Sequence, residues 1–434
     1  MTFCCSPIDE GVSRLRKAME KLVEHQLNYP AAYAIAYFTA YVLICRILRF
    51  RRIKILQRKY GFGTSARPDF SSMTDEEAYE IQTEILEVEF PSLFEKGLQL
   101  ALFRTYGIPS ISKLLTQTAQ LSTTENVGKR YADTAVLLTE IYSNSPSHKR
   151  AIESFARLNY LHGHYLKQGR ITNDDMLYTL ALFMNHPVEW INQYEWRQMT
   201  DLEVCSAATF HKSMGEAMQI SYDVLPGSRS GWKDGLHFYA ELDAWAKEYE
   251  KQHMVPHKDN YATAIKTKEL LLSTIPRFMH GLVGQLISAA MDDRLREAIM
   301  FEPAHPVMKS FLYYFMEIRR MYLRHFSLPK FDWQRQKSLS KDESADGRRW
   351  IELWGTTPHY VKPTLWNRWG PSGWYQLAIG APRPGDKGMC PEGYLRSTVG
   401  PRAFDGKGQD FYKSEQNRLL QARTGGCPFV VLKS

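Results

Sequence analysis

Phe155-Ala-Arg-Leu-Asn-Tyr-Leu-His-Gly-His-Tyr165 is the stretch on which the interpretation of this sequence turns. Its apolar side chains recur with the period of an α-helix and place a histidine on the same stripe: Phe155, Leu158, Leu161, His162 and Tyr165. Such a histidine has one ring nitrogen free to face a cofactor, and Gly163 leaves room beside it for a flat ring. A lone histidine on an apolar helix face is also the pattern of an ordinary core residue. The spacing alone therefore leaves both roles open for His162, haem iron ligand and core histidine.

A polar group precedes this stretch at Arg130, Asp133 and Thr134. The spacing i, i+3, i+4 predicts that the three side chains share one face of a helix. A surface ion pair between Arg130 and Asp133 is one interpretation. The other is a polar cluster at a cofactor, in which the guanidinium binds a carboxylate and a hydroxyl or carboxylate lies near bound oxygen.

An uncharged run of 15 residues, Ala31 to Cys45, stands near the N-terminus. A bilayer span takes about 20 apolar residues, so arginines at its end would have to reach the interface. The flank that follows is strongly basic: Arg46, Arg49, Arg51, Arg52, Lys54, Arg58 and Lys59. Such density is typical of the cytoplasmic side of a span, and a buried core helix is the alternative. We therefore expect a lumenal segment at 1–29, a single transmembrane helix at 30–50 and a cytoplasmic remainder.

The rest of the sequence is helical in pattern. The 434 residues are 44% hydrophobic, which is enough for a large folded core, and no nucleic-acid motif accompanies the net charge of +8. No alternation of period two persists, which predicts an all-α domain over 51–330. Six cysteines without zinc spacing favour a reducing compartment. Residues 331–434 are expected to form a charged linker and an irregular tail rich in Trp, Pro and Gly, packed on the helical domain.

Several helices can be placed within this domain. Thr74-Asp-Glu-Glu77 is a capping box that opens a helix running toward Glu89. Further helices are predicted at about 110–121, 127–143, 147–168, 173–185, 200–220, 236–252, 261–275, 280–300 and 307–326.

Other metal chemistries have weaker patterns in the sequence. A di-iron bundle needs two Glu-x-x-His motifs, and the helical domain offers one, Glu250 to His253. A cytochrome P450 needs Phe and Gly at fixed positions before its thiolate, and both are missing before Cys427. The pair Asp292-Asp293 suits a metal diphosphate, although such a pair is more typical of a helix surface.

Nine short segments carry a resemblance to a known family: Leu102–Pro109, Lys129–Ala135, Arg157–His162, Leu177–Phe183, Glu195–Arg197, Trp366–Gly370, Pro384–Asp386, Gly406–Gln409 and Arg423–Phe429. They resemble the fungal MpaB-type oxygenases, and the likeness covers about residues 30–429. It implies an enzyme bound to the endoplasmic reticulum (ER) membrane that cleaves a double bond in the farnesyl chain of a meroterpenoid intermediate, as in mycophenolic acid biosynthesis.

This family is more distantly similar to bacterial latex clearing protein, a rubber oxygenase. That similarity implies a globin-like helical core with b-type haem, in which His162 is the proximal iron ligand. It also places the distal catalytic cluster on Arg130, Asp133 and Thr134, where Asp133 replaces the lysine of the related enzyme. Arg157 is then expected to pair a haem propionate.

The sequence therefore predicts a haem-dependent oxygenase that uses molecular oxygen on a prenylated small molecule at the ER membrane. The alternative is a non-catalytic, membrane-anchored helical protein that binds a prenylated or lipid-like ligand. Neither interpretation involves nucleic acid, and the sequence gives no indication of the oligomeric state.

Overall fold

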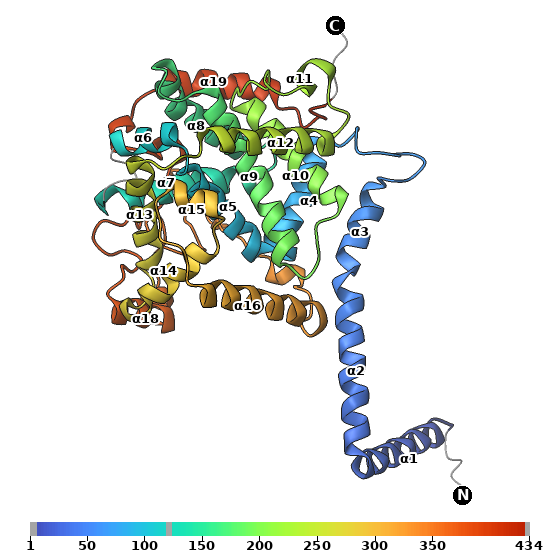
Figure 1. Cartoon of the computed structure of the whole chain (residues 1–434). Coiled ribbons are helices and arrows are strands. Elements are labelled where there is room, and N and C mark those ends of the chain that lie inside the picture. Colours follow the sequence, from blue (N-terminus) through green and yellow to red (C-terminus); the bar gives the residue numbers. More distant parts are fainter. Residues whose placement is uncertain (1–6, 119–123, 430–434) are drawn as a thin grey trace, which may run out of the picture.

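The structure is a computed structural model that describes residues 7–118 and 124–429. Within these ranges the regular elements are helices, and the C-terminal tail also contains two isolated β-bridges. The all-α prediction is therefore confirmed. Most of the helices form one body, and an N-terminal arm projects from it (Figure 1). The similarity of this body to a globin-like domain stays a prediction.

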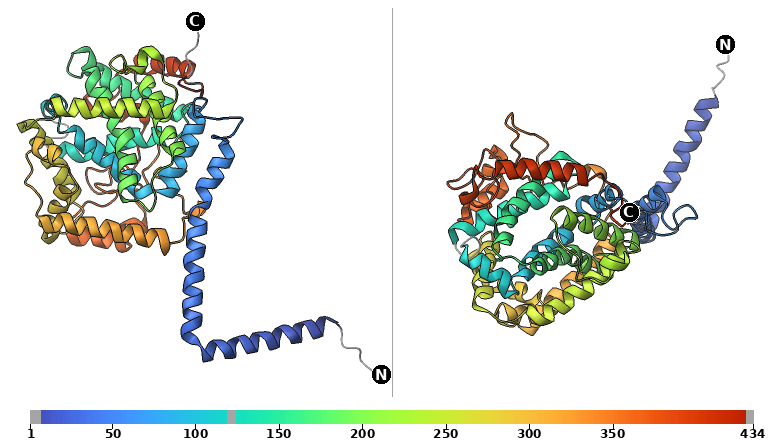
Figure 2. Two further views of the ribbon diagram at one scale, coloured as in Figure 1. Left: turned by 45° about the vertical axis from the view of Figure 1, so that its right-hand side comes forward. Right: turned by 90° about the horizontal axis from the view of Figure 1, so that it is seen from above.

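The N-terminal arm consists of α1 (Pro7–Asn28), α2 (Pro30–Arg49) and α3 (Arg51–Tyr60). Pro30 occupies the first turn of α2, where its missing N–H costs no hydrogen bond. Residues 30–60 are long and apolar enough to cross a membrane, and little of their most apolar stretch is buried against the body. The predicted anchor at 30–50 therefore coincides with α2, which extends away from the body while α3 runs beside it (Figure 2).

The body begins at the predicted capping box. The Thr74 hydroxyl accepts from the Glu77 backbone N–H, and the Glu77 carboxylate accepts from the Thr74 N–H, which opens α4 (Asp75–Glu84). A π-helical turn (Ile85–Glu89) carries this helix to the predicted end, and α5 (Pro91–Thr105) follows.

The centre of the body is the pair of α5 and α9 (Asn173–Tyr194). The predicted end of α9 at residue 185 was wrong, because the helix continues through Pro187. A Cβ on Gly97 of α5 would lie 2.7 Å from the Pro187 Cα, so the two helices touch backbone to backbone. This packing supports the irregular turn that a proline makes inside a helix.

Further helices surround this pair: α6 (Pro109–Gln117), α7 (Thr124–Tyr142), α8 (Lys149–Lys167), α10 (Asp201–Ala217), α11 (Gly227–Ser230), α12 (Gly235–His253), α13 (Lys258–Leu272), α14 (His280–Ala289), α15 (Asp293–Ala298) and α16 (Pro306–His325). The single helix predicted at 280–300 is two helices. Asp292 interrupts it because its carboxylate accepts from the Leu295 N–H and caps α15.

The C-terminal tail is more regular than predicted. It contains α17 (Leu365–Trp369), α18 (Pro371–Ile379) and α19 (Gln409–Ala422), and α19 packs along α8. The tail was expected to be irregular because its Trp, Pro and Gly residues dominate the pattern up to about residue 400. The segment that forms α19 lies beyond them and lacks both Pro and Gly.

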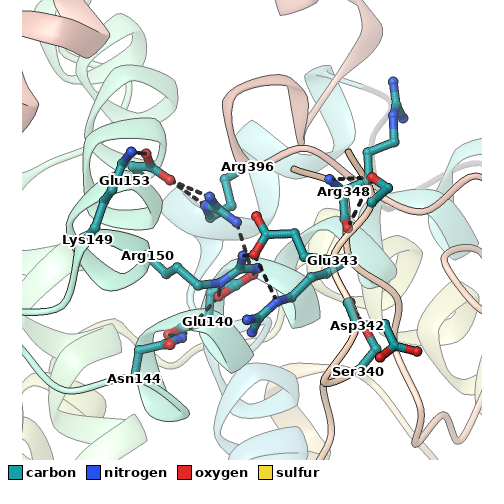
Figure 3. Close-up of polar contacts among 12 residues, drawn as sticks. Glu140, Asn144, Lys149, Arg150, Glu153, Ser340, Asp342, Glu343, Arg348 and Arg396 are labelled. Carbon is teal, nitrogen blue, oxygen red and sulfur yellow. Dashed lines mark hydrogen bonds and ion pairs between the residues drawn. The ribbon is translucent and has the colours of Figure 1, made fainter. Parts of the chain in front are cut away.

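A buried ion network fastens the tail to α7 and α8 (Figure 3). Its centre is Glu140 of α7, whose side chain is fully buried. Arg150 of α8 donates from Nε to Glu140 at 2.9 Å, and the tail residue Tyr394 donates its hydroxyl at 2.7 Å. Arg396 of the tail lies 3.8 Å from Glu140 and 2.6 Å from Glu153 of α8. Separating α7 from α8 would leave buried charges without partners, which is strongly destabilising. This network therefore fixes the two helices against each other.

Candidate active site

A cavity lies among α5, α6, α7, α8, α9 and α10, and the tail residues Pro401 and Phe404 complete its wall. It holds about 1430 Å³ of empty space, a value that includes its open mouth. Most of the wall is leucine, isoleucine, methionine and phenylalanine. Its members with polar side-chain groups are Thr105, Thr118, Arg130, Thr134, His162, Tyr165, Asp175 and Thr179. An apolar cavity with a few convergent polar groups is the usual form of a small-molecule site.

His162 projects from α8 into this cavity, as the apolar stripe predicts. Its Nδ1 atom is buried and has no hydrogen-bond partner among the residues that the structure describes. A buried nitrogen without a partner costs about 1–3 kcal/mol, so its presence needs an explanation. A group bound in the cavity would supply one.

The electrostatic surroundings keep this imidazole uncharged. Burial, together with the nearby positive charge of Arg130, lowers the pKa of His162 to about 4. At neutral pH the ring therefore has a lone pair available for an iron ion. Among the described residues that line the cavity, His162 is the sole histidine and there is no cysteine.

Arg130 and Thr134 line the same cavity from α7. The Arg130 guanidinium donates from Nη1 to the Thr134 hydroxyl, which donates in turn to the Arg130 carbonyl at 3.0 Å. This holds the hydroxyl in one orientation, and the other guanidinium N–H groups have no hydrogen-bond partner among the residues that the structure describes. The sequence prediction that these two side chains would meet His162 at one site is thus consistent with the structure.

Asp133 does not line the cavity. The prediction that Arg130, Asp133 and Thr134 point to one site is therefore met by Arg130 and Thr134 alone. Its carboxylate accepts from Lys129 Nζ at 2.9 Å and from the Tyr360 hydroxyl of the tail at 2.6 Å. Lys129 Nζ also donates to the Gly400 carbonyl at 2.8 Å. Asp133 therefore connects α7 to the tail, and its placement gives no support to direct contact with bound oxygen.

Arg157 also binds the tail. It is 1% exposed, and its Nε donates to the Val399 carbonyl at 2.8 Å. Its guanidinium lies 5.4 Å from the centre of the Tyr160 ring. Arg157 is absent from the cavity wall, so the propionate contact expected for it stays a prediction that this geometry does not favour.

The other metal candidates lie elsewhere and have structural partners. No cluster of three or more His, Cys, Asp or Glu side chains is placed to hold a metal in the described part of the chain. Glu250 forms a bidentate pair with Arg104 at 2.6 Å, and Asp292 pairs with the same guanidinium. The Cys427 thiol donates to the Ser71 carbonyl at 3.2 Å and does not line the cavity.

Comparison with known proteins also indicates a membrane-bound oxygenase. The chain is 40% identical over 397 residues to a protein of Penicillium brevicompactum named ER-bound oxygenase mpaB', and the match covers 91% of this chain and 93% of that protein. A second protein of this organism, named ER-bound oxygenase mpaB, is 38% identical over 82% of this chain and 84% of its own length. The chain belongs to the mpaB family of ER-bound oxygenases. The mpaB protein of Penicillium roqueforti is 46% identical over 62% of this chain and 90% of that protein. No protein family model matches the sequence.

Several segments through which the chain resembles the mpaB family have structural roles. Arg104 joins α5 to α12 and α15 through its two carboxylates. Arg197 pairs with Glu203 of α10 at 2.7 Å and with Glu89 at 3.3 Å. These contacts position the helices of the cavity wall without contributing to it.

Sequence reasoning missed the contribution of the tail to the site. Pro401 and Phe404 line the cavity, although they lie in a segment that was expected only to pack on the domain. One local signal was available for α7. The i, i+4 spacing of Lys129 and Asp133 predicts an ion pair, and its bond turns Asp133 away from Arg130.

Proposed function

We propose that this chain is a haem-dependent oxygenase of the ER membrane that oxidatively cleaves a carbon–carbon double bond in the prenyl chain of a meroterpenoid intermediate. One observation carries the proposal: an uncharged histidine with an unpartnered buried nitrogen lies in an apolar cavity together with Arg130 and Thr134. The largely apolar wall is compatible with a haem, and His162 is the one histidine among the described residues that line it.

In this proposal His162 holds the iron of b-type haem from one side of the cavity. When bound, the haem supplies the chemistry of oxygen activation, and the protein supplies orientation and a dry pocket. The Arg150–Glu140 pair fixes α8 against α7 and thereby sets the distance between His162 and the polar pair on α7.

Arg130 and Thr134 provide the polar end of the cavity. The guanidinium offers directed N–H donors to a carboxylate or to an oxygen atom that gains negative charge. The Thr134 hydroxyl is held by Arg130 on both sides, which restricts where a polar group of the substrate or of oxygen can sit.

The apolar wall suits the prenyl chain of a substrate. Side chains such as Leu115, Leu158, Met176 and Phe183 exclude water and offer no hydrogen bond, which favours an apolar ligand over a polar one. No residue of α2 or α16 belongs to the wall, so a substrate taken from the membrane enters the body to reach His162.

The second candidate function is non-catalytic binding of a prenylated or lipid-like ligand in the same cavity. The apolar wall favours it as well, because burial of an isoprenoid chain needs no cofactor. The two functions differ at His162, which is essential to the oxygenase and has no required role in a carrier.

The deciding experiment is an absorption spectrum with a pyridine haemochrome assay on detergent-purified protein. The matched pair is His162→Ala and His164→Ala, since His164 lies two residues away and is exposed at the surface. We expect about one b-type haem per chain in the wild type and in His164→Ala, and loss of haem in His162→Ala. Retained haem and activity in His162→Ala would refute the assignment. A folded, colourless wild type that takes up no added haem would favour the carrier.

We also propose that residues 1–29 lie in the ER lumen and that the body lies in the cytosol. The basic flank of α2 supports this orientation, although two of its members bind the body: Arg49 donates to the Ser327 carbonyl and Arg52 pairs with Glu84. An Asn-x-Ser acceptor added before residue 1 should be glycosylated. Glycosylation of an acceptor fused after residue 434 instead would reverse the topology.

A further inference from the structure

The helix α16 has an apolar side that faces away from the protein. Its exposed residues recur at intervals of three and four positions, the spacing of one helix face: Phe311, Tyr314, Phe315, Ile318, Met321 and Tyr322. All six are more than half exposed, whereas Met316 on the inner side is buried. An amphipathic helix normally turns its apolar stripe toward the core, so this outer face of α16 needs another apolar environment.

The outer face of α16 ends at the anchor. The Phe326 ring, just after the end of α16, stacks on Phe38 of α2 with ring centroids 5.8 Å apart. The Tyr41 hydroxyl donates to the Phe326 carbonyl at 2.9 Å, and Arg49 donates from Nε to the Ser327 carbonyl at 2.9 Å. The exposed apolar surface of α2 is therefore continuous with the outer face of α16.

These contacts fix the depth of α16 relative to the span. The 20 residues of α2 have a length of about 30 Å, which equals the thickness of a bilayer core. Tyr41 precedes Arg49 by eight residues, or about 12 Å along the helix axis. When α2 crosses a membrane, the end of α16 that binds Tyr41 therefore lies within the apolar layer, at a depth similar to that of interfacial helices.

Aromatic residues of the tail extend the same edge of the body. Trp366 and Trp374 of α17 and α18 are 77% and 57% exposed, and the Tyr375 hydroxyl binds the Thr274 carbonyl before α14. Figures 1 and 2 place α18 and α16 along one edge, near the side from which α2 emerges. Exposed tryptophan and tyrosine are typical of the membrane–water interface.

The polar side of α16 is basic. Lys309, Arg320 and Arg324 lie on the side of the helix opposite the apolar stripe, and Glu317 is the one acidic residue of the helix. Lys309 lies 3.8 Å from Asp293 and Arg320 lies 3.0 Å from Glu317. An apolar stripe backed by basic residues is the pattern of an interfacial helix.

We propose that the outer face of α16, together with α17 and α18, lies in the interfacial layer of the membrane that α2 enters. The body is then held against the bilayer by two elements and has a fixed orientation on it. This inference rests on the membrane association of α2 and is independent of the haem and of the reaction.

Site-directed photo-crosslinking in phosphatidylcholine–phosphatidylinositol vesicles that contain an alkyne-tagged phospholipid tests the proposal. p-Benzoylphenylalanine replaces Phe315, and the matched control replaces Leu420 of α19. The two side chains are 53% and 55% exposed, and α19 lies at the opposite edge of the body (Figure 1). Tyr37 of α2, which is 55% exposed, serves as the positive control for a lipid contact. A fourth variant replaces Trp374.

We expect the phospholipid adduct at positions 315 and 374 to exceed that at position 420 about tenfold and to approach that at position 37. Equal adducts at 315 and 420, with a strong adduct at 37, would overturn the proposal and leave the haem assignment unaffected. A crosslink from position 315 to a second copy of the chain would overturn it as well, because the outer face would then be a protein interface.

Discussion

His162 of α8 and His211 of α10 are two enclosed imidazoles with opposite bonding. Burial lowers the pKa of each to about 4, so both rings are uncharged at neutral pH. His211 is fully partnered: its Nδ1 lies 2.7 Å from the Ala207 carbonyl and its Nε2 lies 2.8 Å from the Tyr142 hydroxyl. The buried Nδ1 of His162 has no partner in the described part of the chain, and the ring lines a cavity. Burial alone therefore does not distinguish these two histidines, whereas their hydrogen bonds together with their position relative to the cavity do.

The largest expected difference between the two histidines is in haem content. His162→Leu should abolish haem binding, while the free energy of unfolding of the haem-free protein should stay the same or rise by up to about 1–3 kcal/mol, because no hydrogen bond is lost and an unpartnered buried nitrogen is removed. Haemochrome assay and denaturant unfolding measure the two quantities. A large loss of stability without loss of haem would make His162 a core residue like His211.

The second expected effect concerns the polar pair on α7. Thr134→Val keeps the shape of the side chain but removes the hydroxyl that accepts from Arg130, and turnover should fall about 10- to 100-fold with haem content unchanged. Oxygen consumption with a prenylated substrate measures it. Thr179→Val is the control, since Thr179 lines the same cavity and its hydroxyl binds its own helix at the Asp175 carbonyl. Equal effects of both substitutions would remove the special role of Thr134.

For His211 the effect should be on stability alone. His211→Leu leaves the buried Tyr142 hydroxyl without its partner and should lower the free energy of unfolding by about 1–3 kcal/mol. Haem per folded chain should not change. Adding Tyr142→Phe should restore part of the loss, because the unpaired hydroxyl is then absent. Strict additivity of the two substitutions would contradict this account of the bond.

The smallest expected effect is a pH dependence that belongs to His211. Its pKa is lower in the folded state than in the unfolded state, so its contribution to stability is present above about pH 6.5 and is lost as pH falls toward 4. In that window His211→Leu should flatten the slope of the unfolding free energy by about 1 kcal/mol per pH unit. Urea unfolding of the haem-free protein at pH 7, 6 and 5 measures the slope. An unchanged slope would mean that His211 does not titrate there.

The helices of this fold were predictable where local chemistry decides them. The Thr74–Glu77 box opens α4 at the expected residue, because the bonds of a cap join neighbours in the sequence. The continuation of α9 through Pro187 could not be predicted. It depends on contact with Gly97, which lies on another helix and allows the backbones to meet.

The residues of the site also fall into those that local sequence spacing places and those that distant contacts place. Helical spacing placed Arg130 and Thr134 on one helix face and His162 on an apolar stripe, and the family resemblance joined the two groups; the structure places all three in one cavity wall. The orientation of Asp133 is set by Tyr360, which is 227 residues away, and that of Arg157 by Val399, which is 242 residues away. Such tail contacts leave no periodic signal near either residue.

The most direct test of the central claim is chemical rescue of a His162→Gly variant. This substitution should leave a space at the ring position and abolish haem binding, and added imidazole should restore the haem spectrum because a free ring can occupy that space as the iron ligand. His211→Gly is the comparison, in which imidazole should change neither the haem content nor the spectrum. Haem retained by His162→Gly without imidazole would contradict the assignment of His162 as the iron ligand.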